Sequence, residues 1–136
     1  MKKRMMKISM GILLIGSVAI AGTSQAVDWK YVTSDNSGNA LYFDPGSVKN
    51  HTFDIVNVWV KYKTGFRYKM NDYGYSVSLI NIDCDEGRLA SEVIVDFDKE
   101  DRFLSSVINP GKPWFSISPG SLYSKLQRTV CPVRFP

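Results

Sequence analysis

Short runs of alternating apolar and polar residues, separated by turn-forming residues, follow one another from residue 28 to residue 108. This pattern is typical of an antiparallel sheet whose strands are joined by hairpins. Because every connection except 63–74 is short, we expect strands that are neighbours in the sequence to pair as a meander. The six predicted strands span residues 28–34, 40–44, 52–63, 75–84, 88–97 and 102–108.

The run TFDIVNVWVKYK, residues 52–63, carries the strongest strand pattern because it is dense in β-branched and aromatic residues. Such a strand, apolar on both faces, is typical of the centre of a sheet, where both faces are covered at least in part. One face is formed by Val56, Val58, Val60 and Tyr62, and the other by Phe53, Ile55 and Trp59.

The run RLASEVIVDF, residues 88–97, alternates apolar and charged positions. Since successive side chains of a strand point to opposite faces, we expect the apolar set to face inward and the charged set outward. The inward set is Leu89, Val93, Val95 and Phe97, and the outward set is Arg88, Glu92 and Asp96.

One helix is predicted near the C-terminus, within ISPGSLYSKLQRTVCP, residues 117–132. Ser118 can cap its first turn, and Pro119 suits the first helical position, where no backbone hydrogen bond is lost. Pro132 disfavours a helical Cys131, so the helix should stop there. A helix of this length is marginal alone in water and needs the sheet for stability. Its apolar stripe consists of Leu122, Leu126 and Val130.

The chain has two cysteines, Cys84 and Cys131, which lie far apart in the sequence. In an exported chain two cysteines indicate one disulfide, whereas a redox pair usually has a close C-x-x-C spacing. A bond between them would fasten the end of the helix to the end of a strand. The predicted fold is therefore α+β, with an antiparallel meander of about six strands packed against one C-terminal helix and one disulfide.

The first 26 residues have the pattern of a cleaved secretory signal peptide. A basic head precedes an apolar run, residues 8–21, and Ser24-Gln25-Ala26 provides a small-x-small exit. The run is shorter than the roughly 20 residues that a membrane span requires. We therefore expect cleavage after Ala26, a single domain over residues 27–136 and no transmembrane segment in the mature protein.

Removal of the signal peptide also changes the charge. The whole chain has 17 Lys and Arg against 13 Asp and Glu, a formal net charge of +4. Lys2, Lys3, Arg4 and Lys7 lie in the signal peptide, which has no acidic residue, so residues 27–136 are balanced. A nucleic-acid partner is not expected, because it would require a basic face or stripe.

Candidate catalytic and metal-binding residues each favour a structural interpretation. His51, the only histidine, lies in a polar turn, and zinc binding fails for want of ligands. DFDKED, residues 96–101, lacks the Gly and Glu of a calcium loop, and the acidic residues of 83–86 are expected in a hairpin turn. Paired carboxylates for glycoside cleavage stay open, although no cleft is implied. We predict a protein that is not an enzyme and has no cofactor or metal.

The longest connection, within KYKTGFRYKMNDYGY at residues 61–75, is rich in Tyr, Arg and Met, which are over-represented at protein interfaces. It is the best candidate for binding a protein partner. The alternative is an extended hairpin whose aromatic side chains partly cover the sheet. The candidate binding residues are Phe66, Arg67, Tyr68, Met70 and Tyr73.

An ordered set of residues across the mature chain resembles the surface-adhesin protein E-like family. The set is Trp29, the Val58-Trp59-Val60-Lys61 strand, Asp83-Cys84, and Trp114 with Ile117, Pro119-Gly120-Ser121 and Cys131. The resemblance covers about Trp29 to Cys131 and implies a small bacterial exported domain, an antiparallel sheet packed against a C-terminal helix. The family takes its name from an adhesin that binds host matrix and serum proteins and is associated with dimers.

From this resemblance we predict an exported, non-enzymatic module that binds host or envelope proteins, with a homodimer left open. The founding adhesin is a lipoprotein, whereas here Val27 follows the predicted cleavage point and no cysteine stands nearby. The location is therefore either the periplasm or the cell surface. Two alternatives stay open: a periplasmic structural or assembly factor without a host ligand, and a small secreted hydrolase.

Overall fold

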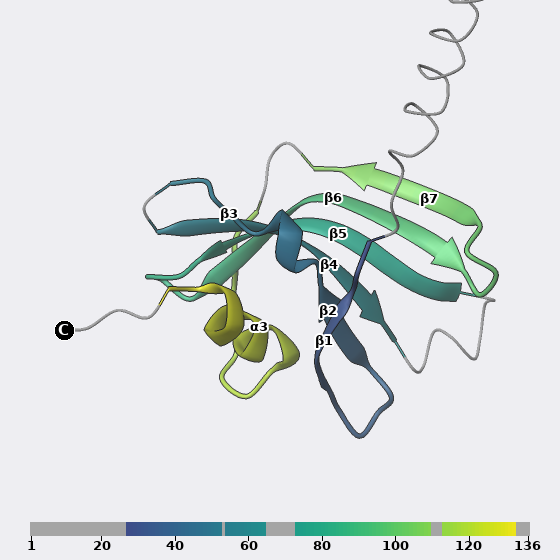
Figure 1. Ribbon diagram of the computed structural model, residues 1–136, viewed down its shortest axis with the longest axis horizontal. Coiled ribbons are helices and arrows are strands. Elements are labelled where there is room, and N and C mark those ends of the chain that lie inside the picture. Colours follow the sequence, from purple (N-terminus) through teal and green to yellow (C-terminus); the bar gives the residue numbers. More distant parts are fainter. Residues whose placement is uncertain (1–26, 53, 65–72, 110–112, 133–136) are drawn as a thin grey trace, which may run out of the picture.

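The computed structural model describes residues 27–52, 54–64, 73–109 and 113–132. Six strands form one antiparallel sheet in the order β1-β2-β4-β5-β6-β7, so the predicted meander is confirmed (Figure 1). Two short strands were not predicted: β3 pairs with β4, and β8 pairs with β6. The elements are β1 (Lys30–Ser34), β2 (Ala40–Phe43), the 3-10 turn η1 (Pro45–Ser47), β3 (Lys49–Asn50), β4 (Ile55–Lys63), β5 (Tyr73–Asp83), β6 (Arg88–Asp98), β7 (Phe103–Ile108), β8 (Phe115–Ser116) and the helix α3 (Leu122–Val130).

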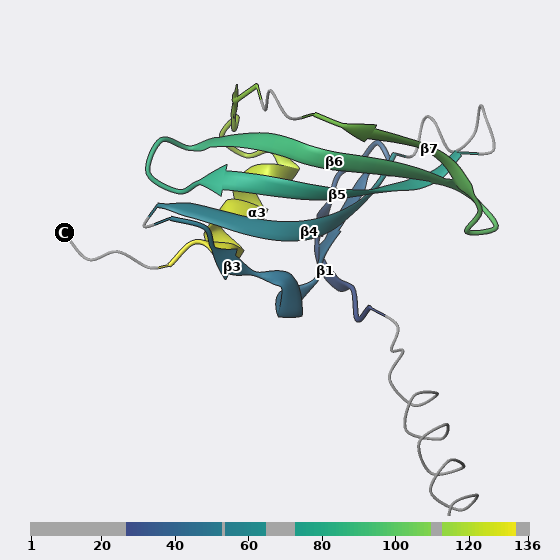
Figure 2. The same cartoon turned by 90° about the horizontal axis from the view of Figure 1, so that it is seen from above.

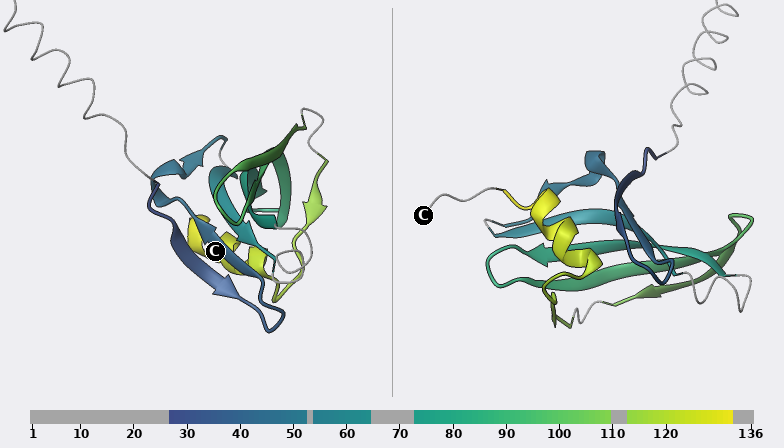
Figure 3. Two further views of the ribbon diagram at one scale, coloured as in Figure 1. Left: turned by 90° about the vertical axis from the view of Figure 1, so that its right-hand side faces the viewer. Right: turned by 90° about the horizontal axis from the view of Figure 1, so that it is seen from below.

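The helix covers one face of the curled sheet, as predicted, and lies beside β1 and β2 (Figure 3). Leu126 is fully buried in the core, with Leu122 and Val130 packed against it from the same stripe. The fully buried side chains beneath it come from β2, β4 and β5, namely Leu41, Val58, Val60, Ile80 and Ile82. No helix in the described part of the chain is long and apolar enough to cross a membrane.

The helix begins later than predicted. Ser121, not Ser118, is the N-cap, and its hydroxyl accepts a hydrogen bond from the backbone N–H of Ser124 at 3.3 Å. Residues 118–121 instead form a turn in which Gly120 has a φ of +78°, and this left-handed conformation interrupts any helix begun at Pro119. The predicted end is confirmed, because Cys131 is the extended C-cap.

A β-bulge in β6 overturns the prediction that Leu89, Val93, Val95 and Phe97 share one face. Leu89 pairs with Ile82 on the core side, but the register shifts between the partners of Leu79 and Ile80, and Val93 pairs with Leu79. Directly paired residues of an antiparallel sheet share a face. The extra residue therefore turns Val93, Val95 and Phe97 to the face away from α3.

The two faces of β4 differ in burial. Val56, Val58 and Val60 are buried, which places β4 at the centre of the sheet as predicted. Cover on both faces, at least in part, was expected. The helix α3 covers one face (Figure 2), and Trp59 on the other face is half-buried. Residues of the segment before β1, of the turn around η1 and of β3 lie beside Trp59 on that face.

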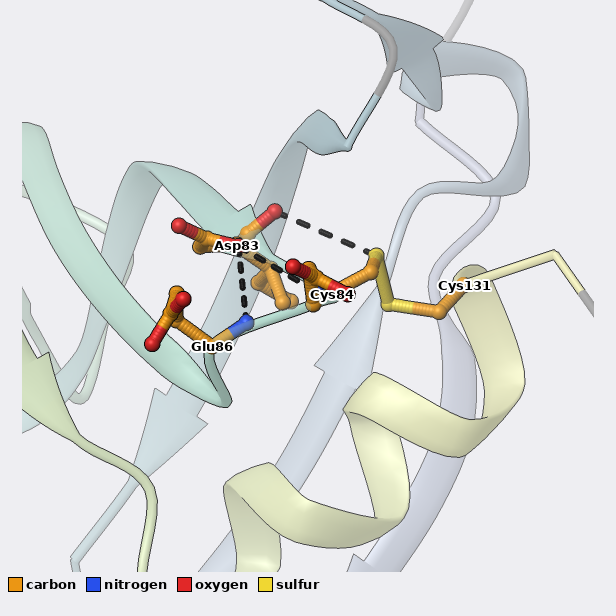
Figure 4. The surroundings of a disulfide bond; sticks show 6 residues. Asp83, Cys84, Glu86 and Cys131 are labelled. Atoms are coloured by element: carbon orange, nitrogen blue, oxygen red, sulfur yellow. Dashed lines mark hydrogen bonds between the residues drawn. A yellow bond between two sulfur atoms is a disulfide. The ribbon is translucent and has the colours of Figure 1, made fainter. Parts of the chain in front are cut away.

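The predicted disulfide is confirmed. Cys84 follows the last residue of β5 and is bonded to Cys131 at the end of α3, with a Cα–Cα distance of 5.8 Å (Figure 4). The neighbouring Asp83 carboxylate accepts hydrogen bonds from the backbone N–H groups of Asp85 and Glu86 at 3.1 and 3.0 Å, and from Arg88 Nε at 3.1 Å. The strand end to which the helix is fastened is thus itself held by a network of hydrogen bonds.

Candidate protein-binding surface

The strand β7 forms the edge of the sheet furthest from β1 (Figures 1 and 2). All six of its residues are exposed, and in the described part of the chain it pairs only with β6. Four of these residues are large and apolar: Phe103 is 62% exposed, Leu104 49%, Val107 55% and Ile108 73%. An edge strand of this kind leaves one row of its backbone donors and acceptors unpaired.

Natural edge strands are usually protected by charge, by proline, by shortness or by a covering element. None of the residues from Phe103 to Ile108 is charged or a proline. An uncovered apolar edge can accept an extended segment from another chain, whose backbone continues the sheet while its side chains contact the exposed apolar positions. Among the described residues, β7 is therefore a candidate protein-binding edge.

The turn before β7 holds this edge in place. The Asp98 carboxylate accepts hydrogen bonds from the backbone N–H groups of Glu100 and Arg102 and from Arg102 Nε, each at 2.9 Å. These bonds, led by that from the Arg102 backbone, hold the pKa of Asp98 below its usual value of 3.8 although burial opposes the shift. Asp101 takes the left-handed backbone conformation that the tight turn requires, with a φ of 65°. The start of β7 is thus fixed by local bonds.

The predicted binding segment connects β4 to β5. Of its candidate residues Phe66, Arg67, Tyr68 and Met70 lie outside the described residues. The strands on either side of this connection end and begin at Lys63 and Tyr73, and Tyr73 pairs with Asp98, where β6 turns toward β7. The described residues that flank this connection therefore lie near the turn that leads into β7.

Tyr73, the fifth candidate, is buried in β5 with only 7% of its surface exposed, and its hydroxyl forms a hydrogen bond with that of Ser76. The next residue, Gly74, lies so close to β6 that a Cβ atom there would be 2.2 Å from the Asp98 carbonyl oxygen. Tyr73 and Gly74 are packed like core residues. A binding role for the connection therefore depends on Phe66, Arg67, Tyr68 and Met70.

An aromatic cluster on the face away from α3 extends this surface. The ring of Tyr75 stacks on Phe97 with centroids 5.1 Å apart, and Lys61 Nζ lies 4.3 Å from the centroid of Tyr75. The Tyr75 hydroxyl donates to Asp101 Oδ1 at 2.8 Å. Burial, followed by that carboxylate, raises the pKa of Tyr75 to about 12, so the hydroxyl stays protonated at neutral pH.

His51 and the acidic residues of 83–86 and 96–101, considered above as candidate catalytic or metal-binding residues, take part in local turn and strand contacts. His51 is exposed, and its backbone N–H donates to the Ile55 carbonyl at 2.8 Å in a tight turn. Asp83 and Asp98 end β5 and β6, and their carboxylates accept hydrogen bonds from the backbone of the hairpin turns that follow. Asp96 lies within β6 and accepts hydrogen bonds from the hydroxyls of Ser76 and Ser105. Among the described residues, no group of three or more His, Cys, Asp or Glu side chains is placed to hold a metal ion.

The sequence analysis did not single out β7 as a binding surface. The available signal was the uncharged run FLSSVI, residues 103–108, within the last predicted strand of the meander. Position in the meander indicates an edge, and absence of charge indicates an unprotected one.

Comparison with protein families gives one match, in which the family model of surface-adhesin protein E covers residues 29–132. Comparisons with curated proteins and with solved structures give no significant match.

Proposed function

This chain belongs to the surface-adhesin protein E family, and on that basis we propose that it is an exported, non-enzymatic module that binds protein partners. The observation that carries the proposal is the exposed apolar edge strand β7. Export rests on the signal-peptide pattern of residues 1–26, with cleavage after Ala26 and a single domain over residues 27–136. The proposed location is the cell surface, with the periplasm as the alternative.

The partner is proposed to add an extended segment along β7. Side chains that alternate along such a segment would contact the four exposed apolar residues, while its backbone would pair with the outer edge of the strand. The connection at 63–74, with Phe66, Arg67, Tyr68 and Met70, is proposed as a second contact at the same end of the sheet. Tyr and Arg are frequent anchors of protein interfaces.

A second copy of this chain would also fit the edge. The order apolar-apolar-Ser-Ser-apolar-apolar from Phe103 to Ile108 reads the same in both directions. Antiparallel pairing about the Ser105–Ser106 bond would place Phe103 opposite Ile108 and Leu104 opposite Val107 of the other copy, as a twofold interface requires. A homodimer is therefore the proposed self-association, and it would compete with a foreign partner for β7.

The test uses the purified exported protein and immobilised matrix and serum proteins, the ligands that the family resemblance implies. The variant Leu104→Lys/Val107→Lys places charge on the exposed edge, where it should leave the unfolding midpoint nearly unchanged. We expect it to weaken capture of a bound ligand about thirtyfold, the effect of losing about 2 kcal/mol of anchor contacts. The matched control, Tyr31→Lys, places charge on the opposite edge strand, where Tyr31 is 58% exposed, and should bind as before.

The triple change Phe66→Ala, Arg67→Ala, Tyr68→Ala tests the second contact on the same ligands, with the unfolding midpoint measured in parallel. Light scattering of each variant reports self-association. Equal capture by the wild type and the β7 variant would refute the role of the edge. A destabilised triple variant whose folded fraction binds normally would support the alternative that these aromatic residues cover the sheet.

A further inference from the structure

A hollow lies on the sheet face away from α3, and β6 separates it from β7. It has a volume of about 360 Å³ and is lined by Val27, Trp29, Asp44, Trp59 and Val77. Trp59 and Val77 come from the two central strands, Asp44 follows β2, and Trp29 precedes β1. The hollow thus combines two indole rings and two valines with a single carboxylate.

Hydrogen bonds join the backbones of Asp44 and Trp59, and one holds the Asp44 carboxylate. The backbone N–H of Asp44 donates to the Trp59 carbonyl at 3.0 Å, and Asp44 Oδ1 accepts from the N–H of Gly46 at 3.0 Å. The Ser47 hydroxyl donates to the Asp44 carbonyl at 2.8 Å and accepts from the Trp59 N–H at 2.9 Å. A ligand would therefore meet a carboxylate already held in place, beside an indole carried on a backbone fixed to it, which reduces the entropy cost of binding.

We propose that this hollow binds a quaternary ammonium group, as found in choline. Tryptophan is the best aromatic partner for a cation, and quaternary ammonium recognition by aromatic side chains is the main functional use of this contact. The methyl groups of such a cation suit the apolar walls formed by Val27 and Val77, and the positive charge suits Asp44. In the described part of the chain, no basic side chain forms an ion pair with Asp44 or lies over Trp29 or Trp59.

Other ligand classes fit the lining less well. An anion would meet the Asp44 carboxylate, and no cation lines this hollow; Lys49 lines the adjoining hollow, which shares Asp44 and Trp59. A sugar carries several hydroxyl groups, and those left without a partner on burial cost free energy. Asp44 is the only lining residue whose side chain carries oxygen, and the two indole N–H groups are the only other polar side-chain groups. A quaternary ammonium group needs no hydrogen bond, so this lining can satisfy it.

Elsewhere the chain's own cations already occupy its aromatic faces. Lys61 lies over Tyr75, Lys63 lies 5.7 Å from the centroid of Tyr42, and Arg88 lies 4.8 Å from that of Trp114. Trp114 therefore provides a matched control, a tryptophan whose cationic partner is internal.

A competing occupant is the chain's own N-terminus. Cleavage after Ala26, as proposed above, would give Val27 an α-ammonium group, which is largely protonated at pH 7. Because Val27 lines the hollow, this group could pair with Asp44 and exclude an external cation. The experiment must separate these two cases.

The test is a titration of the purified exported protein with choline, tetramethylammonium and the neutral carbon isostere of choline, followed by tryptophan fluorescence and calorimetry. Vesicles of phosphatidylcholine, compared with vesicles of phosphatidylglycerol, distinguish a lipid headgroup from a soluble ligand. We expect both cations to bind in the millimolar range and the neutral isostere to bind at least tenfold more weakly.

The variants then assign the site. Asp44→Asn keeps an acceptor for Gly46 and should weaken cation binding about tenfold, Trp59→Leu about thirtyfold, and Trp114→Phe not at all. Equal binding of the neutral isostere, or unchanged binding by folded Asp44→Asn protein, would overturn the proposal. Binding that appears only after the N-terminus is acetylated would also overturn it, because the occupant would then be the chain's own α-ammonium group.

Discussion

Leu126 and Leu104 mark two contrasting regions of this molecule. Leu126 lies in α3, whose C-terminal end is fastened by the disulfide, and none of its surface is exposed. Leu104 lies in β7, and 49% of its surface is exposed. The helix-covered half of the sheet contains the fully buried core, and the β7 edge contributes exposed apolar surface. The proposed function assigns stability and partner binding to different parts of one sheet, and it predicts that each can be changed without the other.

The largest expected effect on the free energy of unfolding comes from removing the disulfide, which fastens α3 to the half of the sheet that it covers. Cys84 and Cys131 are 47 residues apart, and closing a loop of that length stabilises the fold by about 4 kcal/mol. The double variant Cys84→Ala/Cys131→Ala should lose about this much in urea unfolding. Ligand capture by the fraction that stays folded should be unchanged. A variant as stable as the wild type would break the comparison, because the helix would then be held by packing alone.

The next effect compares the two leucines directly. Leu126→Ala leaves a cavity in the core and should cost about 3 kcal/mol, whereas Leu104→Ala should stay within about 0.5 kcal/mol of the wild type. Chemical unfolding of both variants under the same conditions provides the measurement. Similar losses in the two would show that β7 is packed in solution, for example against a second copy.

A smaller effect concerns the stability of the fold at acid pH. Burial raises the pKa of Asp83, but the hydrogen bonds from Glu86, Arg88 and Asp85 outweigh it and hold the pKa below the usual 3.8. A carboxyl group whose pKa is lowered on folding stabilises the fold above its unfolded pKa, and this contribution is lost as the pH falls through the folded value.

Asp83→Asn should therefore lower the unfolding midpoint by a few degrees at pH 7, and the difference from the wild type should close below about pH 4. Thermal unfolding at a series of pH values measures this, with the exposed Asp28→Asn as the control that should follow the wild type throughout. A gap that is constant with pH would indicate a loss of shape or packing rather than of charge.

The amino-acid sequence by itself determined the six long strands, their meander order, the stripe of α3 and the disulfide. Each of these follows from local periodicity, from turn residues such as those at 36–39 and 85–87, or from having only two cysteines to pair. Family membership also follows from the sequence, because it rests on an ordered set of residues along the chain.

Only the tertiary structure decided which surfaces are available for binding. The bulge in β6 turns Val93, Val95 and Phe97 away from the core, although their alternation in the sequence is unbroken. Tyr73 reads as a loop residue but is buried beside Asp98, and Ser121 rather than Ser118 starts the helix. The hollow brings together residues from before β1, after β2, and within β4 and β5. Such features depend on which strands meet and in which register, and contacts between distant segments leave no periodic pattern in the chain.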